Sequence, residues 1–217
     1  MVQLPNNSQR ISIIGKTGSG KTHAGLWHLS IRDFKIPWII INSKNDEAFN
    51  IDHAQYISYD YNFKSKDKGL FIIIPYPDEQ TELNEFLLKL WAKERIGILV
   101  DEAADIGDLP AYERIMKQGR SKNIPVIQLT QRPVGVSRYV ISESEFFQIF
   151  FINDERDIKT IQAFAPIEKG KIPQQESHQS LYYNVLKNKI DLIAPLPPAD
   201  IIYDRLNEKL RKKFNFI

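Results

Sequence analysis

The chain has 217 residues, a formal net charge of +2 and 42% hydrophobic residues, which is typical of one globular domain with a substantial core. It contains no cysteine, which excludes disulfides, thiol catalysis and cysteine-ligated metal centres. Because the charge is nearly neutral, any nucleic-acid contact must come from local basic patches.

Short apolar runs alternate with amphipathic stretches along most of the chain, which predicts an α/β sandwich with a largely parallel central sheet. Asp154 and Thr81 are expected to be helix N-caps, and Gly97 and Gly119 are expected to end helices. The expected strands are 11–15, 38–42, 70–74, 97–101, 125–130 and 146–152, and the expected helices are 20–34, 79–94, 110–120 and 154–164.

The pattern changes after Pro166. Segments 180–186 and 189–194 alternate in the manner of a small β-hairpin, and 199–214 has the spacing of a terminal helix with one apolar face. We therefore expect residues 1–217 to form one domain, with a core at about 10–165 and the hairpin and helix at about 166–217. No run approaches the roughly 20 apolar residues of a membrane span, and no signal-peptide core opens the sequence, so a protein that is intracellular or carried inside a particle is expected.

Residues 11–22 carry the clearest chemical signal, an apolar strand followed by the pattern G-x-x-x-x-G-K-[ST]. Glycines at these positions let successive backbone N–H groups turn toward phosphates, and the following helix adds its positive dipole end. Lys21 is expected to reach the β and γ phosphates of ATP, and Thr22 to ligate Mg²⁺. The expected phosphate-binding residues are Gly15, Lys16, Thr17, Gly18, Ser19, Gly20, Lys21 and Thr22.

Two further strands end in polar residues. Asp101 and Glu102 close the strand at 97–101, where Asp101 would hold Mg²⁺ and Glu102 would polarise an attacking water. Gln131 follows the strand at 125–130 and is a candidate sensor of the γ-phosphate, with Thr130 as the second choice. A strand-end amide with no such role fits the spacing of Gln131 equally well.

The three motifs occur in a fixed order, with Gly-Lys-Thr-Gly-Ser-Gly-Lys-Thr first, Ile-Leu-Val-Asp-Glu-Ala second and the segment 119–133 third. This series resembles the FtsK–HerA superfamily of DNA-pumping ATPases, and in particular the genome-packaging ATPases of icosahedral viruses with an internal membrane. The resemblance runs from about Ile11 to Pro133. It implies a RecA/ASCE-like P-loop NTPase fold and a ring, most often a hexamer, that threads double-stranded DNA while hydrolysing ATP with Mg²⁺.

The same resemblance implies roles and partners. Arg120 matches the arginine finger that is offered to a neighbouring subunit, with Arg114, Arg132 and Arg138 as possible substitutes. Expected partners are double-stranded DNA, further copies of the chain and capsid or viral membrane proteins, in the virion or the host cytoplasm. The implied catalytic set is Lys21, Glu102, Gln131 and Arg120.

Three basic segments are candidates for DNA contact: 61–69, which combines three lysines with Tyr61 and Phe63, 132–139, and 211–213. For each of them a solvated charge run is the simpler interpretation. Two other functions compete with a DNA motor, namely a nucleotide or metabolite kinase and a nucleotide-dependent assembly switch that does not act on DNA. The kinase leaves Glu102 and Gln131 without a role, and stimulation of ATP hydrolysis by DNA separates the motor from both.

Overall fold

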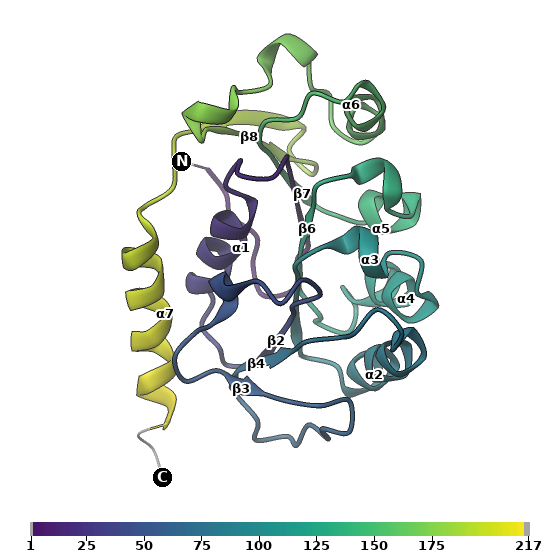
Figure 1. The fold of residues 1–217 in the computed structure, drawn as a ribbon, viewed down its shortest axis with the longest axis vertical. Helices are drawn as coiled ribbons and strands as arrows, with labels where there is room; N and C mark the ends of the chain where they lie inside the picture. Colours follow the sequence, from purple (N-terminus) through teal and green to yellow (C-terminus); the bar gives the residue numbers. More distant parts are fainter. Residues whose placement is uncertain (1, 215–217) are drawn as a thin grey trace.

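The computed structural model describes residues 2–214, which fold around a nine-stranded sheet of order β3-β4-β2-β5-β6-β1-β7-β8-β9 (Figure 1). Strands β1 to β7 run parallel to one another, and β8 and β9 are antiparallel additions at one end. The strands are β1 Ile11–Ile14, β2 Pro37–Ile41, β3 Gln55–Tyr56, β4 Gly69–Ile73, β5 Gly97–Val100, β6 Val126–Thr130, β7 Phe146–Ile149, β8 Ser180–Asn184 and β9 Lys189–Ile193.

Helices cover both faces of the sheet, so the predicted three-layer sandwich is confirmed (Figure 1). Helices α1 and α7 lie together on one face, and α2 to α6 lie on the other. The predicted hairpin forms and extends the central sheet, because β8 pairs with β7. The helices are α1 Lys21–Ser30, α2 Gln80–Lys93, α3 Ala103–Ile106, α4 Pro110–Gln118, α5 Arg138–Ser142, α6 Glu155–Gln162 and α7 Ala199–Phe214.

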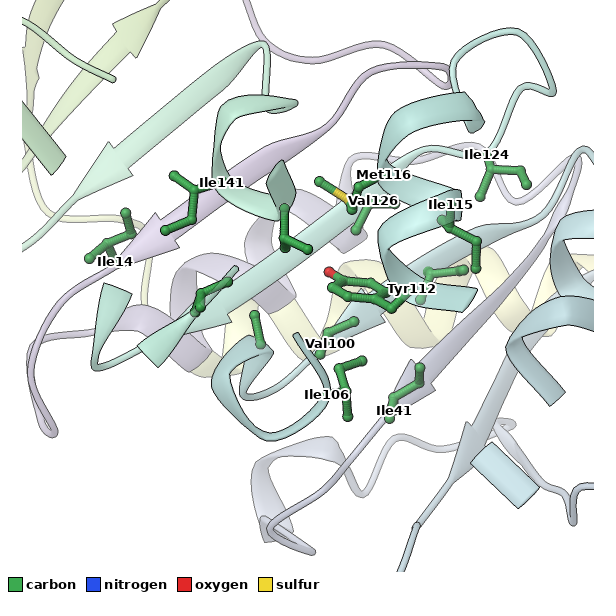
Figure 2. Packing of buried hydrophobic residues seen from close by; sticks show 14 of the residues in the cluster. Ile14, Ile41, Val100, Ile106, Tyr112, Ile115, Met116, Ile124, Val126 and Ile141 are labelled. Carbon is green, nitrogen blue, oxygen red and sulfur yellow. The ribbon is translucent and has the colours of Figure 1, made fainter. Parts of the chain in front are cut away.

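Apart from the exposed two-residue β3, the parallel strands are buried on both faces, which explains their nearly continuous apolar sequences. One packing layer surrounds Tyr112 of α4, whose ring lies among Val100, Ile106 and other aliphatic side chains between helices and sheet (Figure 2). The hydroxyl of Tyr112 donates to Gln128 Oε1 at 2.7 Å, and Gln128 Nε2 donates to Ser12 Oγ at 2.7 Å. These buried polar groups are therefore paired, as a stable core requires.

Several element boundaries differ from the sequence-based prediction. Asp154 is confirmed as an N-cap, because its carboxylate accepts from Arg156 N at 2.9 Å and Asp157 N at 3.3 Å. Thr81 lies inside α2, whose N-cap is Glu79. Strand β3 and the short helices α3 and α5 were not predicted, because two to five residues carry no readable periodicity. Among the described helices, none is long and apolar enough to cross a membrane.

Gly97 does not end a helix, as its position after an amphipathic stretch had suggested. It is the first residue of β5 and pairs in register with Trp38 of β2, whose ring is fully buried. A Cβ placed on Gly97 would lie 2.2 Å from Trp38 Cδ2 and 2.3 Å from Cε2. The absence of a side chain at position 97 therefore makes room for the indole.

We predict that Gly97→Ala lowers the free energy of unfolding by about 1–3 kcal/mol, because the indole has no free space to move into. Urea denaturation with unchanged m-values measures the loss. Gly170→Ala is the matched control, since a Cβ there would meet no atom within 4 Å. Equal stabilities for the two variants would contradict the explanation.

Candidate active site

Four neighbouring parallel strands, in the order β2-β5-β6-β1, end at the same edge of the sheet, and each is followed by polar residues. Lys44 follows β2, Asp101 and Glu102 follow β5, Gln131 follows β6, and the loop 15–20 follows β1. Residues from each of these four segments line a cleft of about 440 Å³. The cleft is lined by Thr17, Gly18, Gly20, Lys21, Thr22, His23, Lys44, Asp46, Asp101 and Gln131.

The loop between β1 and α1 has the tight curvature that its glycines predict. Gly18 and Gly20 adopt positive φ angles of 75° and 104°, which L side chains rarely adopt. A Cβ on Gly15 would lie 2.6 Å from Ser19 Oγ and 2.7 Å from Phe150 Cβ. Gly20 caps α1 without a side-chain hydrogen bond, so the first-turn N–H groups remain available to an anionic ligand.

Lys21 begins α1 and is almost fully buried, with 6% of its surface exposed. Its Nζ donates to the backbone carbonyl of Lys16 at 3.0 Å. Burial lowers the pKa of Lys21 to about 8, and the charge of Lys44 lowers it further while that of Glu102 raises it. A desolvated ammonium held by one carbonyl is well placed to exchange that partner for a phosphate.

Asp101 is 3% exposed, and its Oδ2 has no hydrogen-bond partner within the described chain. Burial raises the pKa of Asp101 to about 6. The carboxylate borders the same cleft as Thr22. A buried, unpaired carboxylate oxygen near a hydroxyl is the oxygen donor set that Mg²⁺ prefers, so these two residues fit the expected metal.

Glu102 is held from two sides. Its Oε2 accepts from Lys44 Nζ at 2.8 Å, and its Oε1 accepts from the backbone N–H of Gln131 at 3.2 Å. Gln131 Oε1 in turn accepts from Thr17 Oγ1 at 2.7 Å. The structure thus joins the candidate water-activating carboxylate to the phosphate loop through Gln131.

Thr130, the second-choice sensor, is engaged within its own turn, because its Oγ1 accepts from Arg132 N at 3.2 Å. Lys44 was missed from the sequence, although it follows the strand predicted at 38–42 and so belongs to the same edge. Lys44 belongs to no recognisable sequence motif. Only its position directly after a predicted parallel strand could have indicated that it lies in the site.

Arg120 lies at the other edge of the sheet from the cleft. It precedes β6, and its Nε is 4.0 Å from Oε1 of Glu145, which precedes β7. Both strands run parallel to β1, whose carboxyl end carries the phosphate loop. Arg120 is 62% exposed and stands away from the nucleotide cleft of its own chain.

The three alternative finger residues also have partners within the chain. Arg132 Nε is 3.0 Å from Asp157 Oδ2, at the same edge as the cleft. The guanidinium of Arg114 lies 5.1 Å from the ring centroid of Trp91, and that of Arg138 packs similarly on a phenylalanine ring. The ion pair of Arg120 with Glu145, at 4.0 Å, is longer than that of Arg132 with Asp157, and the Arg120 side chain is 62% exposed against 50% for Arg132.

The basic segments lie on the surface. The lysines of 61–69 are exposed, but Tyr61 and Phe63 pack inward against the aromatic core beside β4 and do not offer stacking platforms. The arginines of 132–139 are also exposed. In 211–213 the first two side chains are exposed, and the third lies outside the described part of the structure.

A second hollow of about 290 Å³ adjoins the cleft through Gly20 and His23. A hydrogen bond of 2.6 Å joins His23 Nε2 to the carbonyl oxygen of Pro197, and Gln175 Nε2 donates to Thr17 O at 3.1 Å. The segment after residue 166 therefore helps to build the site, which the sequence did not reveal. The hollow is lined by Gly20, His23, Phe150, His178, Pro195, Leu196, Pro197 and Pro198.

Comparison with known proteins identifies the family. No family model matches the sequence. The chain is 41% identical over 224 residues to the DNA packaging ATPase P9 of Enterobacteria phage PRD1, with 98% of each chain covered. The chain belongs to the viral DNA-packaging ATPase family. This confirms the resemblance to packaging ATPases and their activity class.

Solved structures agree with this family in fold. The genome packaging NTPase B204 of Sulfolobus turreted icosahedral virus 2, in complex with AMPPCP, superposes with a TM-score of 0.67 at 18% identity, covering 88% of this chain and 100% of B204. The conjugation coupling protein TcpA of pCW3, with ATPγS, gives a TM-score of 0.65 at 16% identity, covering 95% of this chain and 65% of TcpA. At such identities the likeness shows the fold, which is that of a P-loop ATPase.

We predict that Asp101→Asn stabilises the packaging ATPase in EDTA without nucleotide. The pKa of Asp101 is about 6 in the fold against an ordinary 3.8, so its ionisation costs folding free energy as pH rises through this range. The variant should gain on the order of 2–3 kcal/mol at pH 8, and the gain should disappear near pH 4. Urea unfolding at several pH values measures this gain in the free energy of unfolding. Asp60→Asn, at an exposed position, is the control. A gain independent of pH would contradict the assignment.

Proposed function

We propose that this packaging ATPase hydrolyses ATP to drive double-stranded DNA into a viral capsid, acting as an oligomeric ring. The observation that supports the proposal is the placement of Glu102, which accepts from the backbone N–H of Gln131, while the Gln131 side chain accepts from Thr17 of the loop after β1. Family membership supports the DNA substrate, since P9 is described as a DNA packaging ATPase. The ring and its hexameric number rest on the resemblance to FtsK–HerA motors.

In the proposed reaction the triphosphate lies on residues 15–22, and Lys21 exchanges the Lys16 carbonyl for phosphate oxygens. Asp101 and Thr22 would hold Mg²⁺, which supplies positive charge to the phosphates when bound. Glu102 accepts a proton from the attacking water, and Gln131 reports loss of the γ-phosphate. The base of ATP occupies the adjoining hollow, whose apolar walls and histidine rings suit an aromatic ring.

Arg120 completes the site of an adjacent subunit in this proposal. Its exposure and its place at the edge opposite the cleft support a role in trans, since it cannot serve the site of its own chain. DNA contacts are assigned to the exposed basic side chains of 61–69 and 132–139. Capsid or viral membrane proteins would anchor the ring, in the virion or in the host cytoplasm.

A kinase, or a nucleotide-dependent assembly switch that does not act on DNA, accounts for fewer of the residues in the site. A kinase transfers phosphate to an acceptor hydroxyl, so it does not need a carboxylate such as Glu102 to activate water. A switch that only bound nucleotide would require neither Glu102 nor its connection through Gln131 to the loop. The hydrolytic motor gives each of these residues a role.

We predict that long duplex DNA stimulates ATP hydrolysis and that Glu102→Gln lowers kcat at least about 100-fold while ATP still binds. The loss follows because the amide cannot accept the proton of water. Phosphate release with and without DNA, beside nucleotide binding by calorimetry, measures both. Robust turnover that ignores DNA would favour the kinase or the switch.

A second prediction concerns the arginine finger. Arg120→Ala should reduce DNA-stimulated turnover about 1000-fold in uniform assemblies, because the transition-state charge loses its partner. Mixed with wild type, it should depress activity more than in proportion to its fraction. Arg156→Ala, another exposed arginine, is the control. A strictly proportional loss on mixing would contradict action in trans.

A further inference from the structure

A side-chain hydrogen bond joins Thr17 of the phosphate loop to Gln131 after β6. Thr17 Oγ1 donates to Gln131 Oε1 at 2.7 Å, the usual length for a hydroxyl donor. Both residues line the nucleotide cleft. The bond engages the oxygen of the glutamine amide and leaves its nitrogen, Nε2, as the end available to a ligand in the cleft.

The backbone on each side of this bond is held by other contacts. Gln131 N donates to Glu102 Oε1 at 3.2 Å, and Gln175 Nε2 donates to Thr17 O at 3.1 Å. Gly18, the next loop residue, has a φ of 75°, and a Cβ there would lie 3.2 Å from Gln175 Nε2. The two backbones are thus fixed independently, and the bond between the two side chains sets the orientation of the Gln131 amide.

That orientation has a chemical consequence, because the two ends of a glutamine amide have opposite hydrogen-bonding character. The oxygen only accepts hydrogen bonds, and the nitrogen only donates them. Half a turn about the last torsion of the side chain exchanges the two ends at nearly the same place. A neighbouring hydroxyl that donates to Oε1 selects one of these two orientations, and in this chain that hydroxyl belongs to Thr17.

We propose that Thr17 is a positioning residue for the γ-phosphate sensor, because its hydroxyl holds the Gln131 amide with Nε2 as the donor to the terminal phosphate. This inference rests on the proposed function and refines the role of Gln131 within it. Phosphate oxygens accept hydrogen bonds, so they attract Nε2 and repel Oε1. Thr17 therefore selects the amide orientation that detects a γ-phosphate.

Thr17 acts through Gln131 and not on the nucleotide itself. Its hydroxyl has one hydrogen to donate, and Gln131 takes it. The lone pairs that remain on Oγ1 offer no attraction to phosphate. The donors of the loop to the nucleotide are its backbone N–H groups and Lys21, and none of these depends on the Thr17 side chain. Removal of the hydroxyl therefore changes the response to the γ-phosphate and leaves the grip on ADP.

The first experiment compares Thr17→Val, which removes the hydroxyl and keeps the shape, with Thr17→Ser, which keeps the hydroxyl. In Thr17→Val, kcat for ATP hydrolysis with duplex DNA should fall about tenfold, while the affinity for ADP stays within about twofold of wild type. Thr17→Ser should restore most of kcat. An unchanged kcat in Thr17→Val, an equal loss in Thr17→Ser or an equal loss of ADP affinity would overturn the proposal.

Thr160→Val is the matched control for these measurements. Thr160 Oγ1 donates to Arg156 O at 2.9 Å within α6, so the same change removes a side-chain hydrogen bond at a distance from the residues that line the cleft. Its kcat and ADP affinity should equal those of wild type. Thermal melting of all three variants confirms that each is folded before activities are compared.

A double-mutant cycle tests whether the effect passes through Gln131. In Gln131→Ala there is no amide to orient, so the addition of Thr17→Val should lower kcat by less than about twofold. A purely structural role of Thr17 in the loop would lower kcat by the same factor in both backgrounds. Equal factors would therefore overturn the proposal.

A spectroscopic measurement follows the amide itself. In chain labelled with ¹⁵N, the side-chain NH₂ signals of Gln131, assigned by their loss in Gln131→Glu, should move when a non-hydrolysable ATP analogue is added and stay in place with ADP. In Thr17→Val the movement with the analogue should be smaller, because part of the amide has the reversed orientation. Identical movement with both nucleotides, or in both chains, would contradict the assignment.

The failure of this inference and the failure of the proposed function give different results. If wild type does not hydrolyse ATP, the proposed function fails and the role of Thr17 fails with it. If wild type hydrolyses ATP under stimulation by DNA and Thr17→Val is as active as wild type, the role of Thr17 alone fails.

Discussion

The site depends on the parallel pairing of β2, β5, β6 and β1. Their in-register pairs, such as Ile41 with Val100 and Ile14 with Thr130, bring four strand ends to one edge at the spacing that sheet hydrogen bonding imposes. The distances between the phosphate loop, the acids and Gln131 are therefore properties of the sheet. The apolar residues that maintain the pairing therefore also position the candidate catalytic groups.

The cleft holds charged groups at a cost to the empty chain. Burial moves the pKa of Lys21 down and that of Asp101 up, so each is pushed toward its neutral form. Bound nucleotide and metal would supply the missing partner for each, since phosphate suits the ammonium and Mg²⁺ suits the carboxylate. The buried charges of Lys21 and Asp101 lower the stability of the chain without ligand. Pairing them with phosphate and Mg²⁺ would recover that free energy and so favour binding.

The sequence revealed what local patterns encode. Glycine spacing predicted the tightly curved loop after β1, the acids at 101 and 102 were predicted to follow the strand beside it, and Asp154 was identified as a cap from its own neighbours. Gly97 was misread because its reason lies in Trp38, which belongs to another strand and meets it only in the folded sheet. Lys44 was overlooked for a related reason, since its partner Glu102 is distant in sequence and no motif joins them.

The separation of Arg120 from the cleft of its own chain has a consequence for assembly. If Arg120 on one edge serves the phosphate loop on the other edge of a second copy, the contact between subunits is head-to-tail, with two different surfaces meeting at each contact. Such contacts form a ring when the rotation between subunits closes and an open filament when it does not. With Arg120 as the finger, an open row would always leave one terminal site without its arginine, so full activity would itself report ring closure.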